Sequence, residues 1–223
     1  MCFLALCFLA GAVFVWLRVT AADVESLPPL QTGDIVFQTD GSGQALAIML
    51  ASASPFSHVG IVLIDSAGKP VVWEAVGPVK ETPLAEWIAQ GRGGRLQVMR
   101  FAKPLSQEAW QKVFDWIKKQ RGKPYDIYFT DDDDRFYCSE LVHDALKAAL
   151  GITLGKPQPV ASLNLDNAPV RKLIAARWQN YPLCQGGKAQ DFKSCFEIIK
   201  AQNLITPAAL AADARLQTVY TNY

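Results

Sequence analysis

Hydrophobic residues follow one pattern before residue 101 and another after it. In the first part they form short apolar runs bounded by Gly, Pro, Asp or Ser, which is typical of β-strands. These runs predict strands at 33–37, 58–64, 71–76 and 95–101, and the turn between the second and third strands favours a hairpin. Two short helices are expected between the strands, over residues 44–53 and 83–90.

In the second part the hydrophobic residues follow the helical repeat. The spacing predicts amphipathic helices over 106–121 and 136–150, and less regular ones over 170–178 and 191–202. Thr206 begins a short last helix. Because the strands come first and the long helices follow, the pattern predicts the α+β class.

The N-terminal segment is hydrophobic throughout. Residues 1–17 contain no charged side chain, Arg18 ends the run, and residues 19–21 (Val-Thr-Ala) have the small-residue pattern of a signal-peptidase site. No basic residue precedes the run, and 17 apolar residues are at the short limit for spanning a bilayer. Removal as a signal peptide and retention as a membrane anchor therefore both stay open.

These features divide the chain into three parts. Residues 1–21 are the signal peptide or anchor, and residues 22–32, which contain two adjacent prolines, form an extended tether. Residues 33–223 form one domain. We expect an exported protein, periplasmic or associated with the cell envelope, with membrane association through residues 1–17 if the segment is kept.

Composition and charge exclude several functional classes. Half of the residues are hydrophobic and the formal net charge is +1, which suits a globular protein and gives no reason to expect a nucleic-acid partner. The chain has no His-Glu-x-x-His or Cys-x-x-Cys spacing, no phosphate-binding glycine loop and no Gly-x-Ser-x-Gly elbow. No metal and no cofactor are therefore expected.

The cysteines point to one unpaired thiol. After the N-terminal segment the chain keeps Cys138, Cys184 and Cys195. A short stretch containing Gly186-Gly187 separates the last two, so a disulfide between Cys184 and Cys195 is predicted for an oxidising compartment. This pairing leaves Cys138 free. Three reduced, buried cysteines in a cytosolic protein are the alternative.

Cys138 stands at the beginning of a predicted helix, where free N–H groups and the helix dipole favour a thiolate. His143 is five residues further along the helix and is rotated from Cys138 by roughly 140°, so it cannot serve as the base. His58, at the start of an apolar strand, is then the candidate base. Glu74 lies in the return strand of the hairpin and is the candidate carboxylate to orient His58.

Each of these residues also has an ordinary structural interpretation. A cysteine at a helix start is often a small buried hydrophobe. A histidine that begins a strand is usually a satisfied or surface residue, and a glutamate in an edge strand normally faces water. The hypothesis depends on their joint occurrence in a chain that offers few other candidates.

Five motifs in a fixed order strengthen that hypothesis. Together they resemble the YiiX/YaeF-type permuted papain-like amidases, a branch of the NlpC-like cell-wall hydrolase superfamily. The resemblance covers residues 31–150, and weaker similarity continues from there as far as Val219. The motifs are Gly-Asp-Ile-Val-Phe at 33–37, Ser-His-Val-Gly at 57–60, Glu-Ala-Val-Gly-Pro-Val at 74–79, Gly-Lys-Pro-Tyr-Asp at 122–126 and Tyr-Cys-Ser-Glu-Leu-Val at 137–142.

The resemblance implies a circularly permuted papain-like fold, with an antiparallel sheet packed against helices. It also implies a cysteine nucleophile, a histidine base and a polar third member, which fall on Cys138, His58 and Glu74. The histidine precedes the cysteine in the chain, as the permuted branch requires.

Three further residues are candidates to assist the site without being the nucleophile, the base or the carboxylate. Tyr137 and Tyr125 could each donate a phenol hydrogen bond to an oxyanion. Asp34 could also bond near the site, although a cap between turn and strand is the preferred interpretation. The acidic run at 131–134 lacks the alternate spacing of a calcium loop, and we interpret it as a solvated loop bordering the cleft.

The expected activity is that of a cysteine amidase or peptidase that works through a thioester acyl-enzyme. Peptidoglycan peptide amides and N-acyl or lipid-linked compounds of the envelope are the substrate classes that fit, so the partner expected is an amide- or ester-containing envelope substrate. Two alternatives stay open. One is an acyltransferase with the same Cys–His chemistry, and the other is a non-catalytic protein that binds the cell wall on this fold.

Overall fold

Six strands pair into one antiparallel sheet in the computed structural model, which describes residues 24, 27–132 and 134–223. Each neighbouring pair in the sheet is antiparallel. The spatial order, with the bounds of each strand, is β4 (Val79–Pro83), β3 (Pro70–Ala75), β2 (His58–Ile64), β1 (Ile35–Gln38), β5 (Gln97–Phe101) and β8 (Leu216–Thr221).

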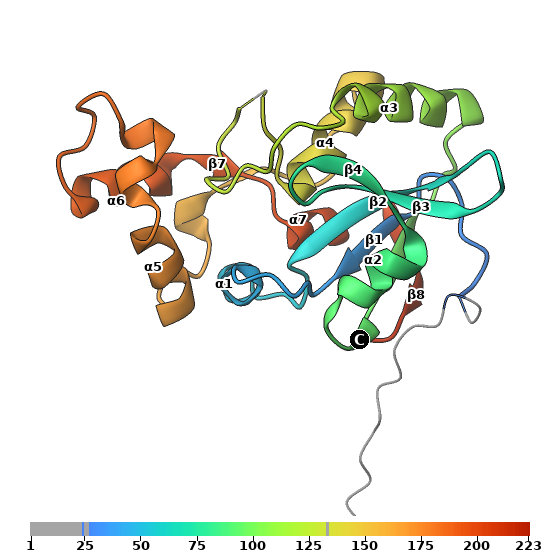
Figure 1. Ribbon diagram of the computed structural model, residues 1–223, viewed down its shortest axis with the longest axis horizontal. Coiled ribbons are helices and arrows are strands. Elements are labelled where there is room, and N and C mark those ends of the chain that lie inside the picture. Colours follow the sequence, from blue (N-terminus) through green and yellow to red (C-terminus); the bar gives the residue numbers. More distant parts are fainter. Residues whose placement is uncertain (1–23, 25–26, 133) are drawn as a thin grey trace, which may run out of the picture.

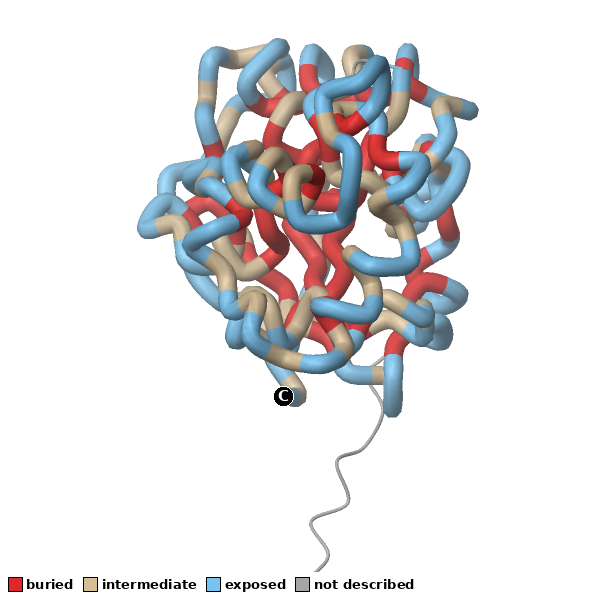
Figure 2. Tube along the Cα trace, turned by 90° about the vertical axis from the view of Figure 1, so that its left-hand side faces the viewer, coloured by how far each residue is buried: buried red, intermediate tan, exposed pale blue. Residues whose placement is uncertain are grey.

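Alternation along the strands divides the core between the two faces of this sheet. On β2, Val59 and Ile61 point to the face covered by α3 (Gln107–Lys119) and α4 (Cys138–Leu150). Val62 points to the other face, where α2 (Leu84–Gln90) brings Trp87 against it. The central strands are therefore buried on both sides, and Figure 2 shows the buried residues concentrated in the middle of the trace.

The chain between β6 and β7 forms a separate lobe, which we call the C-terminal module (residues 158–204). It contains the short strands β6 (Gln158–Pro159) and β7 (Asn203–Leu204), which pair with each other, and the helices α5 (Ala168–Ala175) and α6 (Phe192–Ala201). Its own small core is closed by a disulfide between Cys184 and Cys195. In Figure 1 the module lies beyond one end of the sheet, next to α1 (Ala45–Ser52), and the chain returns through α7 (Pro207–Ala211) to β8.

The structure confirms the predicted α+β class with an antiparallel sheet against helices. Two strands of the six-stranded sheet, β4 and β8, were not predicted, and neither were the two-residue strands β6 and β7. β4 and β8 lie at the edges of the six-stranded sheet, where one side of a strand meets water and the apolar pattern is weak. The helix predicted from residue 136 begins at Cys138, because the Phe136 N–H bonds back to the Pro124 carbonyl and Tyr137 is extended.

The predicted signal peptide or anchor at 1–21 lies outside the described residues, as do residues 22, 23, 25 and 26 of the predicted tether. Residues 27–32 of the tether form no helix or strand, and Leu27 and Leu30 pack against the core that includes α2. No helix in the described part of the chain is long and apolar enough to cross a membrane.

Candidate active site

Cys138 is the first residue of α4, and the fold brings its sulfur to the start of β2. Its Sγ lies 4.0 Å from the carbonyl oxygen of Ser57, the residue before His58. The residue is 2 % exposed, so its thiol is almost fully buried. As the first helical residue it has a backbone N–H that does not take part in the helical ladder, and it lies at the positive end of the helix dipole.

His58 and Glu74 form a buried pair beside this thiol. Nε2 of His58 lies 2.6 Å from Oε2 of Glu74, and both side chains are almost fully buried. Because Glu74 occupies Nε2, the other ring nitrogen, Nδ1, is left for the sulfur of Cys138. Burial alone lowers the pKa of His58, but its hydrogen bonds with Cys138 and Glu74 outweigh burial and raise the pKa to about 10. The imidazole is therefore held as a cation at neutral pH.

Thr82 supports the carboxylate from the edge strand β4. Its hydroxyl donates to Oε1 of Glu74 at 2.6 Å, so both carboxylate oxygens are engaged. Burial raises the pKa of Glu74, yet the hydrogen bonds from His58 and Thr82 and the nearby charges keep it below its ordinary value of 4.5. Sequence reasoning did not find Thr82, because it depends on β4 and on its diagonal position across the strands.

Two apolar contacts fix the orientation of the pair. The Trp87 ring of α2 stacks on the His58 ring, with 6.0 Å between centroids and 29° between planes. Gly60 keeps β2 and β3 close together, because a Cβ there would lie 2.3 Å from Cγ1 of Val72 and 3.0 Å from the carbonyl oxygen of Trp73. The imidazole is thus restrained by an aromatic face and by a close strand pair.

Glu140 shows how the start of α4 avoids a competing negative charge. Glu140 lies two residues after the nucleophile, and its carboxyl group accepts a hydrogen bond from the Tyr137 N–H at 3.2 Å. Burial, together with the charges of Asp144 and Asp126, raises its pKa to about 9. At neutral pH the group is therefore uncharged and does not oppose a thiolate on Cys138.

The candidate supporting residues have three different positions. The Tyr125 hydroxyl accepts the Gln44 amide N–H at 3.1 Å and interacts with the side chain of Cys138. The Tyr137 hydroxyl accepts the Ile205 N–H at 3.1 Å, so it anchors α4 to the chain before α7. Burial raises the pKa of both phenols well above its usual value, which keeps them protonated.

Asp34 is not brought into the site. Its carboxylate accepts two hydrogen bonds from Arg100, at 2.6 and 2.8 Å, and one from the Gln31 N–H. It precedes β1, whereas His58 pairs with the far end of that strand at Gln38. Its hydrogen bond from the Gln31 N–H and its ion pair with Arg100 give Asp34 a structural role. His143 also has a structural role, since its Nδ1–H donates to the Leu154 carbonyl at 2.6 Å.

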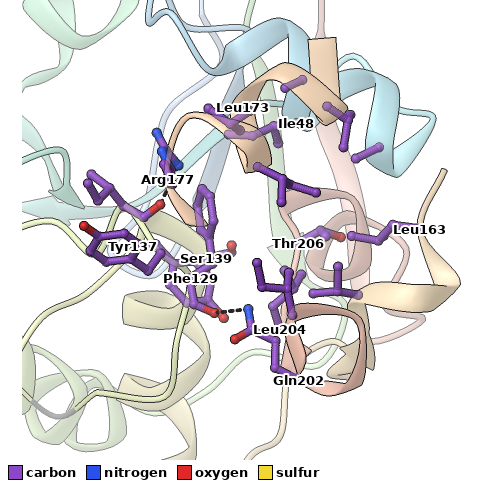
Figure 3. A pocket seen from close by; sticks show the side chains of 18 of the residues that line it. Ile48, Phe129, Tyr137, Ser139, Leu163, Leu173, Arg177, Gln202, Leu204 and Thr206 are labelled. Carbon is purple, nitrogen blue, oxygen red and sulfur yellow. Dashed lines mark hydrogen bonds between the residues drawn. The ribbon is translucent and has the colours of Figure 1, made fainter. Parts of the chain in front are cut away.

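An apolar pocket opens on the nucleophile. Figure 3 shows side chains from α1, from the C-terminal module and from the chain before α7 converging on it. Cys138, Ser139 and Ser57 are among the residues that line the pocket. Its walls are mostly aliphatic or aromatic, and include Ile48, Phe129, Leu163, Val170, Leu173 and Leu204.

The described residues do not fit a metal centre. Within residues 24, 27–132 and 134–223 no group of three or more His, Cys, Asp or Glu side chains is arranged to hold a metal ion.

Comparisons with known proteins place the chain in one family. The model of the family described as permuted papain-like amidase enzyme, YaeF/YiiX, C92 family, matches residues 29–220. The uncharacterized protein YiiX of Escherichia coli K12 is 44% identical over 154 residues, which is 69% of this chain and 76% of that protein. A crystal structure described as metalloprotein YiiX from Escherichia coli O157:H7 is similar with a TM-score of 0.75 and 38% identity, covering 86% of this chain and 97% of that one.

Proposed function

Since the chain belongs to the YaeF/YiiX (C92) family of permuted papain-like amidases, we propose that it is a cysteine hydrolase that cleaves amides carrying a long apolar acyl group. The observation that carries this proposal is the apolar pocket lined in part by Cys138, whose side chain interacts with His58 of the His58–Glu74 pair. An apolar pocket of this kind binds alkyl chains better than the charged peptides of peptidoglycan. N-acyl or lipid-linked envelope compounds are thus the favoured substrates.

In the proposed reaction, the Cys138 sulfur attacks the carbonyl carbon of the bound amide while His58 carries the proton that came from the thiol. The new S–C bond forms as the π electron pair moves to the carbonyl oxygen. The N–H at the start of α4 is placed to bind this oxyanion. As the oxyanion collapses, the C–N bond breaks and His58 gives its proton to the leaving amine.

The resulting thioester is then hydrolysed by water. His58, now neutral, accepts a proton from the attacking water, the C–S bond breaks, and the carboxylic acid leaves. The sulfur departs as a thiolate beside the newly formed imidazolium, which restores the starting state. Glu74 holds the ring throughout and stabilises its cationic form, with Thr82 fixing the second carboxylate oxygen.

The first test is the alkylation of Cys138 by iodoacetamide in residues 22–223. An ordinary thiol has a pKa of about 8.5 and reacts slowly in acid. We expect labelling that continues well below that pH and that slows strongly in the variants His58→Ala and Glu74→Ala. Labelling that follows an ordinary thiol, unchanged in both variants, would instead support a binding protein on this fold.

The second test is hydrolysis of N-acyl amides of increasing chain length, with Cys138→Ala as the inactive control. Mass spectrometry of the quenched reaction is expected to show the acyl group on Cys138. Adding an amine or alcohol acceptor separates hydrolysis from acyl transfer, because a transferase makes the new amide or ester in preference to the free acid. A protein that binds the amides but never acylates contradicts the proposal.

The pocket can be tested by narrowing it. Leu173→Trp places a large ring among the lining side chains, whereas Lys172→Trp adds the same ring on the exposed side of α5. If the ring displaces two methylenes, each contributing about 0.8 kcal/mol, kcat/KM for long acyl chains falls about tenfold. Short acyl amides and the Lys172→Trp variant keep wild-type values. Equal losses for short and long chains would show that the acyl group lies elsewhere.

We also propose that the protein acts outside the cytoplasm, at the cell envelope. The apolar segment 1–17 and the Cys184–Cys195 disulfide support this location. Fractionation of cells that express the full chain, with protease added to spheroplasts, is expected to find the domain on the outer side of the inner membrane. Recovery of the domain in the cytosol with reduced thiols would refute it.

A further inference from the structure

A chain of polar contacts runs from the C-terminal module to the nucleophile. Arg177, which follows α5, donates through its Nη2 to Oε1 of Gln44 at 2.9 Å. The Nε2 of Gln44 donates to the Tyr125 hydroxyl at 3.1 Å, and Tyr125 interacts with Cys138. Two of these residues come from segments more than 130 positions apart in the sequence, so the contacts depend on the tertiary fold.

The position of Tyr125 itself is fixed by its backbone. It bridges to Phe136, two residues before Cys138, and the Phe136 N–H bonds to the Pro124 carbonyl at 3.1 Å. The following N–H, of Asp126, bonds to the Phe136 carbonyl at 3.1 Å. The backbone of Tyr125 is thus held alongside the chain that leads into α4.

The order of donors and acceptors in this chain of contacts sets the direction of the Tyr125 O–H. A guanidinium only donates, so the Gln44 amide must turn its oxygen to Arg177 and its NH₂ group to Tyr125. The phenol oxygen then accepts, and its own proton cannot be given to Gln44. The O–H is left to donate on the side of Cys138, where the oxyanion of an acyl intermediate would form.

We propose that Gln44 and Arg177 are positioning residues that make Tyr125 a hydrogen-bond donor to the oxyanion formed at Cys138. This inference rests on the proposed hydrolase function and deepens it. No proton is transferred from Tyr125, which only donates a hydrogen bond as the carbonyl π electrons move to oxygen, and releases it when the C–N bond breaks.

The anchoring of Arg177 supports this role. Besides Gln44, its guanidinium donates to the Ile127 carbonyl and lies 5.8 Å from the centre of the Phe129 ring. The same loop is bound to the module by the Tyr181 hydroxyl and the Gln202 amide. Figure 3 shows Arg177 at one side of the pocket and the bond from Gln202 to the Phe129 carbonyl. The module therefore holds the donor that orients Gln44.

The decisive variant is Gln44→Glu, which keeps the shape of the side chain and its pairing with Arg177. A carboxylate presents an acceptor to Tyr125, so the phenol turns its proton away from Cys138. We expect kcat to fall by about 100-fold, the range seen when one oxyanion donor is lost, with KM unchanged. Gln107→Glu, at the exposed start of α3, adds the same charge away from the site and is expected to behave as wild type.

A substrate-free readout separates positioning from folding. A long-chain aldehyde adds the thiol to give a hemithioacetal oxygen at the oxyanion position, whereas the alcohol of the same length only fills the pocket. Gln44→Glu is expected to weaken binding of the aldehyde at least tenfold and to leave the binding affinity of the alcohol unchanged. In a Tyr125→Phe background the Gln44→Glu change is expected to have no further effect on either value. Arg177→Met leaves the Gln44 amide free to turn. This variant is expected to weaken aldehyde binding as well, by a smaller factor than Gln44→Glu.

The outcomes distinguish the two proposals. A wild-type protein that neither hydrolyses N-acyl amides nor binds the aldehyde more tightly than the alcohol overturns the proposed function, and this inference with it. A wild type active in both assays, with Gln44→Glu retaining kcat and aldehyde affinity, overturns the positioning role alone. Equal weakening of alcohol and aldehyde also refutes it, because that result reports a distorted pocket.

Discussion

Replacing Thr82 by valine removes one hydroxyl from the carboxylate that holds His58 and preserves the shape of the side chain. In the wild type this hydroxyl donates at 2.6 Å to a fully buried Glu74 oxygen. A hydrogen bond to a charged group contributes about 1.5–3 kcal/mol, and its loss leaves a buried acceptor without a partner. The free energy of unfolding at pH 7 is therefore expected to fall by about 2 kcal/mol. For a protein of this size that is a drop in Tm of about 4–8 °C.

The pH dependence of this loss identifies its cause. The pKa of Glu74 lies below 4.5 in the folded protein, so its ionised form contributes stability that is present above pH 4.5 and is lost as the pH falls through the folded value. Without the Thr82 hydroxyl the folded pKa rises. The difference between wild type and variant is therefore largest at neutral pH and shrinks in acid, where Glu74 is protonated in both proteins.

The assay is urea unfolding at pH 7 and at successively lower pH, until the stability no longer changes because Glu74 is protonated, with kcat/KM measured in parallel on an N-acyl amide. We expect kcat/KM to fall about tenfold, because a carboxylate with a higher pKa stabilises the His58 cation less. Thr82→Ser keeps the hydroxyl and is expected to retain most stability and activity. If Thr82→Val matches the wild type at pH 7, or loses the same stability throughout the acid range, the assigned role of Thr82 is wrong.

The other predictions concern packing, cross-linking and charge. Gly60→Ala is expected to cost about 1–3 kcal/mol of folding free energy in urea unfolding, because its Cβ meets the neighbouring strand, whereas Gly43→Ala, with nothing within 4 Å, stays near wild type. Replacing Cys184 and Cys195 together by alanine reopens a loop with a sequence separation of 11 and is expected to lower stability by about 3 kcal/mol, while a wild-type Tm unaffected by reductant would contradict this. Glu140→Gln removes a group whose folded pKa, about 9, lies above its unfolded value. The variant is thus expected to gain stability relative to wild type as the pH rises from 5 to 9, and a constant difference across that range would show that the carboxyl is not held neutral.

The three main candidate residues could be named from the sequence, because the signals for them are local. Cys138 follows from a helix start, and His58 and Glu74 follow from a hairpin whose turn is visible in the sequence. Thr82 and Gln44 could not be found in that way. Thr82 requires the pairing of an edge strand with weak apolar alternation, and Gln44 requires a contact with Arg177 across 133 positions. Asp34 was included for its type alone, and its partner Arg100 was recognisable only from the sheet order.

The separation of the cysteines between two hydrophobic cores has a consequence for how the chain folds under oxidising conditions. The three cysteines among the described residues allow three pairings, and only the pairing of Cys184 with Cys195 closes a short loop. Joining either of them to Cys138 closes a loop at least four times longer, which costs about 1.2 kcal/mol more in chain entropy. Cys138 meanwhile becomes buried within the main core, apart from the module. Oxidation thus favours the disulfide between the two cysteines that are nearest in the sequence. Cys138 remains reduced, and it is the thiol that the proposed chemistry requires.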